Sequence, residues 1–133
     1  MAIEIEFKDF EKFVEFMVNC NHRFNCPENF ALAFIRPEFK EEYEKLKEVV
    51  KEVLRNTDIF CEIDNNLFVI LTGTDKKGAD FISKAIYEFF NKSVVEVYID
   101  FPEDGKSAEE LLKNLETAVE NKYGFLIGKY FRK

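Results

Sequence analysis

Several residue types are scarce or absent in this sequence, and each absence limits what the protein can be. The 133 residues include no tryptophan and one histidine but 16 phenylalanines, so we expect a core rich in phenylalanine rings. No apolar run approaches the roughly 20 residues that a membrane-spanning helix needs. The first residues carry no basic segment followed by an apolar one, so no export signal is expected.

Charge and cysteine content exclude further classes. The formal net charge is −7, which argues against nonspecific binding to DNA or RNA, although a local basic pocket could still hold a nucleotide. Three cysteines without framework spacing indicate free thiols in a reducing, cytoplasmic environment. The abundance of lysine and glutamate favours a thermophilic source.

The chain has the composition of a folded domain. Hydrophobic residues make up 47% and charged residues 34% of it, which is typical of a globular protein rather than a disordered one. Its length allows one domain with a substantial core, and no repeat, linker or low-complexity stretch interrupts it. We therefore expect residues 1–133 to form a single domain.

Hydrophobic periodicity predicts helices that alternate with strands. Helices are expected at 8–20, from Pro37 to about 56, at 78–91 and at 108–122, and strands at 30–35, 58–72 (a hairpin), 94–101 and 125–131. Asn65 and Asn66 suit the hairpin turn because asparagine tolerates positive φ. Ser107 and Glu110 form the pattern of a capping box, and Gly124 is expected to end the last helix.

This order predicts an α/β (α+β) fold. Its centre is a β-α-β-β-α-β unit, the ferredoxin-like arrangement that palm domains share. Such a unit folds into a mostly antiparallel sheet flanked by helices.

The second half of the sequence resembles a known family. The segment from Asp58 to Phe101, the turn Pro102–Gly105 and the helix start Glu109–Leu112 are similar to the same parts of GGDEF domains. These domains have the diguanylate cyclase, or nucleotide cyclase-like, fold, and active members condense two GTP molecules into cyclic di-GMP. The resemblance covers most of the chain and is strongest after residue 55.

The family's five-residue signature falls on Asp64, Asn65, Asn66, Leu67 and Phe68. In active members two glycines let the nucleotide approach and an acid at the third position binds Mg²⁺. Here only the final phenylalanine is retained, and the third position holds the neutral amide of Asn66, a poor ligand for a cation that prefers anionic oxygen. The resemblance thus implies a degenerate domain with no metal and no cofactor.

The remaining catalytic positions also depart from the family. The strand that should end in a second metal-binding aspartate ends in Ile35-Arg36, and Arg36 would repel a metal, while Glu38 is an uncertain substitute. The segment that should bind guanine is shorter by about a dozen residues. Phosphoryl transfer depends on positioning and on metal-assisted charge stabilisation, so the resemblance implies an inactive relative of diguanylate cyclases.

One ligand site of the family has a counterpart here. Active members carry an inhibitory Arg-x-x-Asp five residues before the signature, and Arg55 and Asp58 stand at that position. A guanidinium can bind guanine acceptors or phosphate, and a carboxylate can accept from guanine N–H groups. Many members add an arginine from the following helix, where this chain has Lys84. The resemblance implies an inactive regulatory domain, a signalling or protein-interaction module that could sense cyclic di-GMP through Arg55, Asp58 and Lys84. The structural alternative makes Arg55 a partner of the helix dipole and Asp58 a turn residue.

Two other functions remain open. Phe7, Phe10, Phe13 and Phe16 recur at every third position, so the first helix could serve a purely structural role in dimerisation or partner docking without any nucleotide. An enzyme could also use Glu38 and Asp64 with an unusual metal.

The cysteines offer a weaker alternative. Cys20, His22, Cys26 and Cys61 lack the spacing of common zinc sites. We expect buried structural thiols and a surface histidine.

Overall fold

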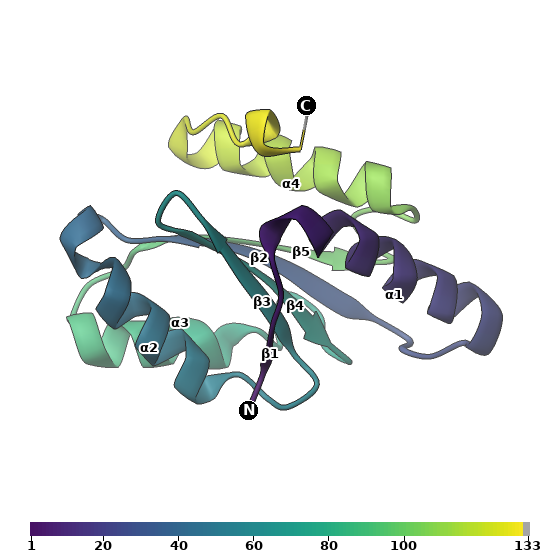
Figure 1. Cartoon of the computed structure of the whole chain (residues 1–133), viewed down its shortest axis with the longest axis horizontal. Coiled ribbons are helices and arrows are strands. Elements are labelled where there is room, and N and C mark those ends of the chain that lie inside the picture. Colours follow the sequence, from purple (N-terminus) through teal and green to yellow (C-terminus); the bar gives the residue numbers. More distant parts are fainter. Residues whose placement is uncertain (132–133) are drawn as a thin grey trace.

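The computed structural model describes residues 1–131 and contains one five-stranded sheet with helices on both faces (Figure 1). The strands are β1 (Ile3–Glu4), β2 (Phe30–Arg36), β3 (Ile59–Ile63), β4 (Asn66–Thr72) and β5 (Val95–Phe101). The α-helices are α1 (Phe10–Phe24), α2 (Tyr43–Val53), α3 (Asp80–Phe90) and α4 (Ala108–Tyr123), and short 3-10 helices lie at Phe7–Asp9, Lys40–Glu42 and Gly128–Tyr130. The predicted mixed fold is confirmed.

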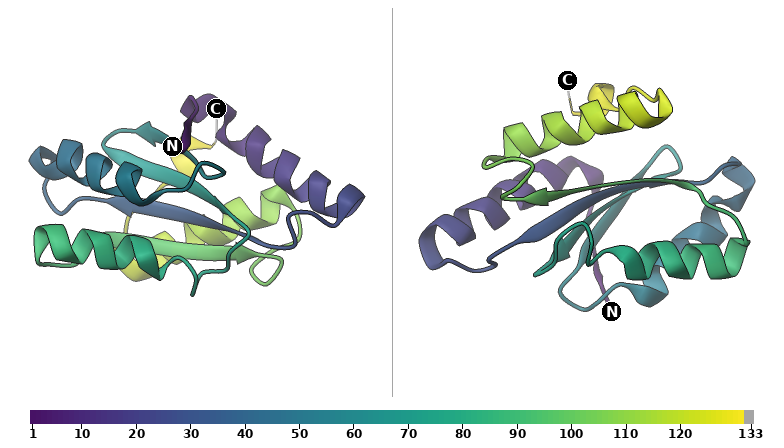
Figure 2. Two further views of the ribbon diagram at one scale, coloured as in Figure 1. Left: turned by 90° about the horizontal axis from the view of Figure 1, so that it is seen from below. Right: turned by 180° about the vertical axis from the view of Figure 1, so that it is seen from behind.

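The sheet has the order β1-β3-β4-β2-β5, and all its pairs are antiparallel except β1 with β3. Figure 2 shows the resulting three layers, with α1 and α4 on one face and α2 and α3 on the other. Strand β2 lies inside this sandwich, and its residues from Phe30 to Ile35 are completely buried. This explains why β2 reads as an uninterrupted apolar run.

Each face of β2 serves a different helix pair. Phe30, Leu32 and Phe34 belong to the core beneath α1 and α4, whereas Ala31 and Ala33 face α2 and α3. Because alternate residues of a strand point to opposite faces, this one segment contributes to both cores.

Two predicted helix ends are confirmed, both in α4, whereas α1 runs to Phe24, beyond its predicted end at residue 20. The Ser107 hydroxyl accepts a hydrogen bond from the Glu110 amide at 3.1 Å, and Gly124 ends α4 with a φ of 79°. Asp9 stands at the start of α1 but makes no side-chain capping bond there. Helix α2 ends at Val53, three residues before the predicted position, and Pro37 lies ahead of its preceding 3-10 turn rather than in its first turn.

The last predicted strand is wrong. Residues 125–131 form a loop and the 3-10 helix Gly128–Tyr130. Their apolar side chains pack against the core under α1 and α4, where Ile127 is only 2% exposed. The alternation that suggested a strand is satisfied by this packing. At the opposite edge the short strand β1 was missed, because two paired residues give no periodic signal.

The cysteines divide by position. Cys61 is buried in β3, and burial raises the pKa of its thiol to about 12. Cys20 is half-buried on α1 and Cys26 is exposed, so the prediction of buried thiols is wrong for these two. His22 is on the surface, as predicted.

Within residues 1–131, no helix is both long and apolar enough to cross a lipid bilayer.

The hairpin turn is displaced by one residue from the prediction. Ile63 pairs with Asn66, which leaves Asp64 and Asn65 as the two turn residues, with φ of 51° and 62°. Two successive positive φ values define a type I′ turn, whose twist matches that of the flanking strands. Asn66 is therefore not a turn residue but a completely buried member of β4.

This turn predicts how substitutions at Asn65 behave. Asn65→Gly should keep or raise the free energy of unfolding by about 0.5 kcal/mol, because glycine adopts positive φ without steric cost. Asn65→Val should lower it by about 1–2 kcal/mol, because a β-branched residue is strained there. Urea denaturation measures both. Equal stabilities of the two variants would contradict the assigned turn.

Candidate functional site

The signature segment meets the end of β2 and the C-terminal residues at one corner of the sheet. Because Ile35 pairs with Leu67, Arg36 at the end of β2 lies beside Asn66 at the start of β4. Nη1 of Arg36 donates a hydrogen bond to Oδ1 of Asn66 at 3.2 Å. The guanidinium carbon lies 4.3 Å from the centre of the Phe125 ring. A cation thus already occupies the neighbourhood of Asn66.

The amide of Asn66 is fully engaged. Its oxygen accepts from Arg36, and its Nδ2 donates to the Tyr130 hydroxyl at 3.2 Å. Asn66 is completely buried, so this pair of bonds satisfies an amide that water cannot reach. Burial, and secondarily the charge of Asp64, raises the pKa of Tyr130 and keeps its phenol neutral. The C-terminal segment therefore closes over the signature position.

Phe68, the retained signature residue, is a core residue. Its ring centroid lies 5.2 Å from those of Phe7 and Phe34 and 5.6 Å from that of Phe131. Tilted and edge-on pairs of this kind add roughly 0.5–1.5 kcal/mol each beyond area burial. Leu67 is buried on the opposite face, toward α2 and α3, whereas Asp64 and Asn65 are exposed.

The acids suggested for an unusual metal do not meet in a cluster. Glu38 pairs with Lys92 at 2.6 Å, and Lys92 also contacts Glu42. Among residues 1–131, no group of three or more histidine, cysteine, aspartate or glutamate side chains is placed to hold a metal ion. The arrangement at this corner instead presents a guanidinium, an amide and a phenol.

Arg55 and Asp58, predicted as a ligand site, bind each other. Nε and Nη2 of Arg55 donate to the two carboxylate oxygens of Asp58 at 3.1 and 2.9 Å. The carboxylate also accepts from the backbone N–H groups of Arg55 and Thr72 at 2.7 and 3.1 Å. Asp58 is completely buried, whereas 43% of the Arg55 side chain is exposed. The pair closes the connection between α2 and β3 against the end of β4.

Lys84 lies on α3 at a position that does not contact Arg55. It pairs with Asp80 at 3.3 Å, and both side chains are largely exposed. It lines a hollow of about 470 Å³ together with Ser83 and Glu96. The residue of α3 that contacts Arg55 is Phe81, whose ring centre is 5.6 Å from the guanidinium. Lys84 is thus paired with its own helix neighbour rather than with Arg55.

Sequence reasoning missed Phe125 and Tyr130 as members of the site. Both lie in the segment that was predicted as a strand, and no local signal places a chain end against Arg36, which is about 90 residues away in sequence.

Sequence reasoning also missed the buried Asp100, whose Oδ2 accepts a hydrogen bond from the Lys76 amide at 2.9 Å. Burial raises the pKa of Asp100, a core position that the strand pattern alone would assign to an apolar residue.

The Arg55–Asp58 pair predicts a large stability effect. Asp58→Ala should lower the free energy of unfolding by about 3 kcal/mol, because it leaves a guanidinium and two backbone donors without their acceptor. The matched control is Asp80→Ala, which removes an exposed partner of Lys84 and should cost less than about 0.5 kcal/mol. Urea unfolding of both variants tests this. A similar small loss for both would show that the buried pair contributes little.

Comparison with solved structures identifies the fold. A DGC (diguanylate cyclase) protein from Thermotoga maritima superposes with a TM-score of 0.67 at 19% identity, over 89% of this chain and 95% of that one. A sensory box/GGDEF family protein from Caulobacter crescentus gives 0.65 at 11% identity, over 88% and 91%. The isolated GGDEF domain of TpbB (YfiN) from Pseudomonas aeruginosa gives 0.64 at 16% identity, over 92% and 87%.

These likenesses establish one point. The chain has the fold of GGDEF, or diguanylate cyclase, domains over about nine-tenths of its length. No family model matches the sequence. No curated protein matches it either. The expected fold class is therefore confirmed.

Proposed function

We propose that this protein is a catalytically inactive GGDEF-fold domain that acts as a regulatory, protein-interacting module. The observation that supports this most directly is the Arg36 guanidinium bonded to Asn66 at 3.2 Å. The resemblance places a magnesium ligand at Asn66. Here the charged group nearest to that amide is the Arg36 guanidinium, which is positive. The amide oxygen already accepts a hydrogen bond from it.

Electrostatics and access both favour this proposal. Mg²⁺ requires an octahedron of oxygen ligands and is bound through carboxylates and phosphates, so a fixed guanidinium repels it. Phe125 stacks on Arg36 and Tyr130 bonds to Asn66, so the C-terminal segment fills the approach to the signature. Without metal-assisted charge stabilisation, phosphoryl transfer loses its main source of catalysis.

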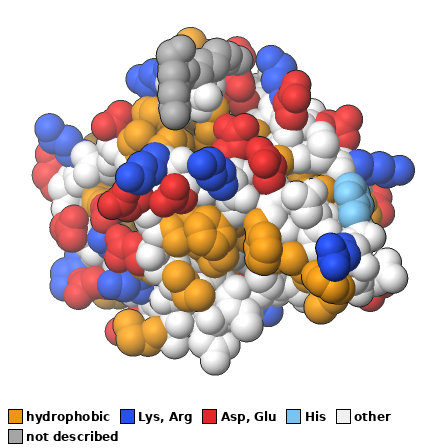
Figure 3. Space-filling view, turned by 45° about the vertical axis from the view of Figure 1, so that its right-hand side comes forward, with side chains coloured by type: hydrophobic (Ala, Val, Ile, Leu, Met, Phe, Trp, Pro, Cys, Tyr) orange, Lys and Arg blue, Asp and Glu red, His pale blue; other side chains and the backbone are white. Residues whose placement is uncertain are grey.

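The surface supports an interaction role. Phe16 and Phe24 on α1 are 60% and 64% exposed, although Phe10 of the same helix is completely buried. Figure 3 shows hydrophobic side chains gathered beside rows of charged ones on the face that carries His22 of α1. Apolar groups left in water next to charged rims are typical of protein-binding surfaces.

The proposal predicts no cyclase activity. Incubation with GTP and Mg²⁺ should yield no cyclic di-GMP by chromatography, and Mg²⁺ should leave the melting temperature unchanged because no metal binds the folded state. Asn66→Asp should remain inactive, since its carboxylate would accept from Arg36 instead of a metal. Turnover by the wild type would overturn the proposal and would favour an enzyme that uses Glu38 and Asp64.

Cyclic di-GMP sensing is the second candidate function. Arg55 favours it, because the guanidinium is partly exposed and is held in place by Asp58 and by the Thr72 carbonyl at 2.8 Å. Nε and Nη2 are occupied by these bonds, so Nη1 of the fixed guanidinium is the group that can bind a phosphate or a guanine edge at low entropic cost. Asp58 is completely buried, so Arg55 would carry this contact without it.

Calorimetry tests this candidate. Titration of cyclic di-GMP into the wild type should release heat, and Arg55→Lys should weaken binding roughly tenfold, because lysine keeps the charge but loses the guanidinium that Asp58 holds in place. Arg23→Lys, at an exposed position on α1, is the matched control and should bind like the wild type. No heat in the wild type, or equal heat for both variants, would exclude Arg55 as a sensor and leave the interaction role alone.

A further inference from the structure

The two edges of the sheet differ in the hydrogen bonds that their outward-facing backbone groups make within the chain. At the β5 edge, outward-facing backbone groups of Glu96 and Asp100 are bonded within the chain, whereas within residues 1–131 no such bond is found for Tyr98 between them. The Asp100 N–H donates to Oδ2 of Asp104 at 2.9 Å, the Asp100 carbonyl accepts from the Asp104 N–H at 2.7 Å, and the Glu96 N–H meets the Tyr123 hydroxyl at 3.5 Å. An edge whose donors are occupied in this way cannot accept another strand easily.

The β1 edge is open. The N–H groups of Ile3 and Ile5 donate to Asp58 and Phe60 of the neighbouring segment, so those of Ala2 and Glu4 point away from the sheet. No side chain of residues 1–131 accepts from either of these outward groups. A free strand edge is a template for pairing with another chain.

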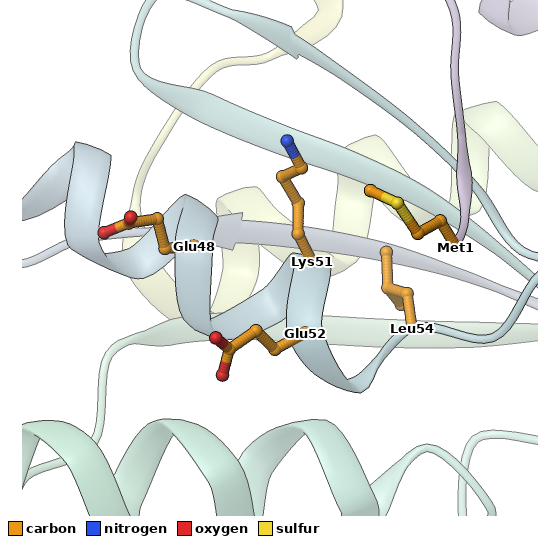
Figure 4. A pocket seen from close by; sticks show the side chains of 5 residues that line it. All are labelled: Met1, Glu48, Lys51, Glu52 and Leu54. Carbon is orange, nitrogen blue, oxygen red and sulfur yellow. The ribbon is translucent and has the colours of Figure 1, made fainter.

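Apolar side chains lie on both faces of this open edge. Ile3 is 52% exposed, and it shares its face with Ile5, which packs against the core under α1 and α4. On the other face, Met1 is 93% exposed and borders a hollow of about 350 Å³ whose apolar wall also includes Leu54 (Figure 4). An edge that exposes apolar groups on both sides has the character of an interface rather than of a protected edge.

The charges around the edge are self-complementary. Lys51 of α2 borders the hollow and points from the helix toward the sheet, where its Nζ lies 5.8 Å from the centre of the Phe60 ring, and Glu48 and Glu52 border the same hollow (Figure 4). Lys47 of α2 pairs with Glu4 of β1 at 3.8 Å and with Glu62 of β3. A surface that carries both signs in one row can pair with a copy of itself across a two-fold axis, because each lysine then meets an acid of the other copy.

From these observations we propose that the β1 edge pairs with the β1 edge of a second copy of this chain. In antiparallel register about a two-fold axis, Ile3 faces Ile3 of the second copy, and Ala2 exchanges hydrogen bonds with Glu4. Like charges are then not directly opposite each other, and the two sheets join into one. This inference specifies the partner of the interaction module proposed above.

Sedimentation and substitution test the pairing. The wild type should shift with concentration toward twice its mass of 15.7 kDa. Ile3→Lys should weaken dimerisation by at least roughly tenfold by placing two charges at the axis, and so should Ala2→Pro, which removes only an outward donor. Leu126→Lys, at a residue that is 67% exposed on the C-terminal segment, is the matched control and should dimerise like the wild type.

A cross-link gives an independent readout. Under mild oxidation Ile3→Cys should form a covalent dimer, because directly opposed residues of a non-hydrogen-bonded pair lie within disulfide distance. Leu126→Cys and the unsubstituted protein should not, with all three proteins carrying Cys26→Ser because that thiol is exposed. A wild type that stays monomeric, or cross-linking that is equal in all three proteins, would overturn the proposal and assign the edge to a strand of a different protein. GTP turnover would instead refute the inactive role and leave the dimer intact.

Discussion

The register of β2 against β4 is the constraint on which the remaining structure depends. Pairing of Ile35 with Leu67 sets which side chains of both strands face each helix pair. It also brings Arg36 to Asn66. Because side chains alternate along a strand, a slip by one residue would exchange the two cores and separate this pair, so the fold and the candidate site follow from a single alignment.

The C-terminal segment illustrates how burial competes with strand formation. A net backbone hydrogen bond contributes about 1 kcal/mol, whereas burying a large apolar side chain contributes about 1.5–3 kcal/mol. Ile127 is almost fully buried and Phe131 joins the rings of Phe7 and Phe68. At the β5 edge, Asp104 and Tyr123 already bond to backbone groups of Asp100 and Glu96, two of the residues with which a sixth strand would pair. Packing on the helix face therefore prevails.

The charged groups around Asn66 and around Asp58 give the candidate site its character. The cyclase chemistry that the resemblance implies would need negative oxygens to bind a metal near the hairpin, whereas this corner carries a guanidinium with an aromatic ring on its face. Asp58, the carboxylate best placed by sequence to contact a ligand, is turned inward and bound by Arg55 and Thr72. At both places the charged groups are hydrogen-bonded within the protein itself.

Most helices and strands of this protein, and its fold, could be predicted from the sequence alone. Periodicity located the four helices and the strands from β2 to β5, and the residues around Asp58–Leu112 indicated the GGDEF fold, since burial on alternate faces is a local property. The turn at Asp64 and Asn65, the strand β1 and the place of residues 125–131 were decided only by tertiary structure. Each depends on contacts between residues distant in sequence, such as Asn66 with Tyr130, and no local pattern encodes which of two apolar surfaces a segment will cover.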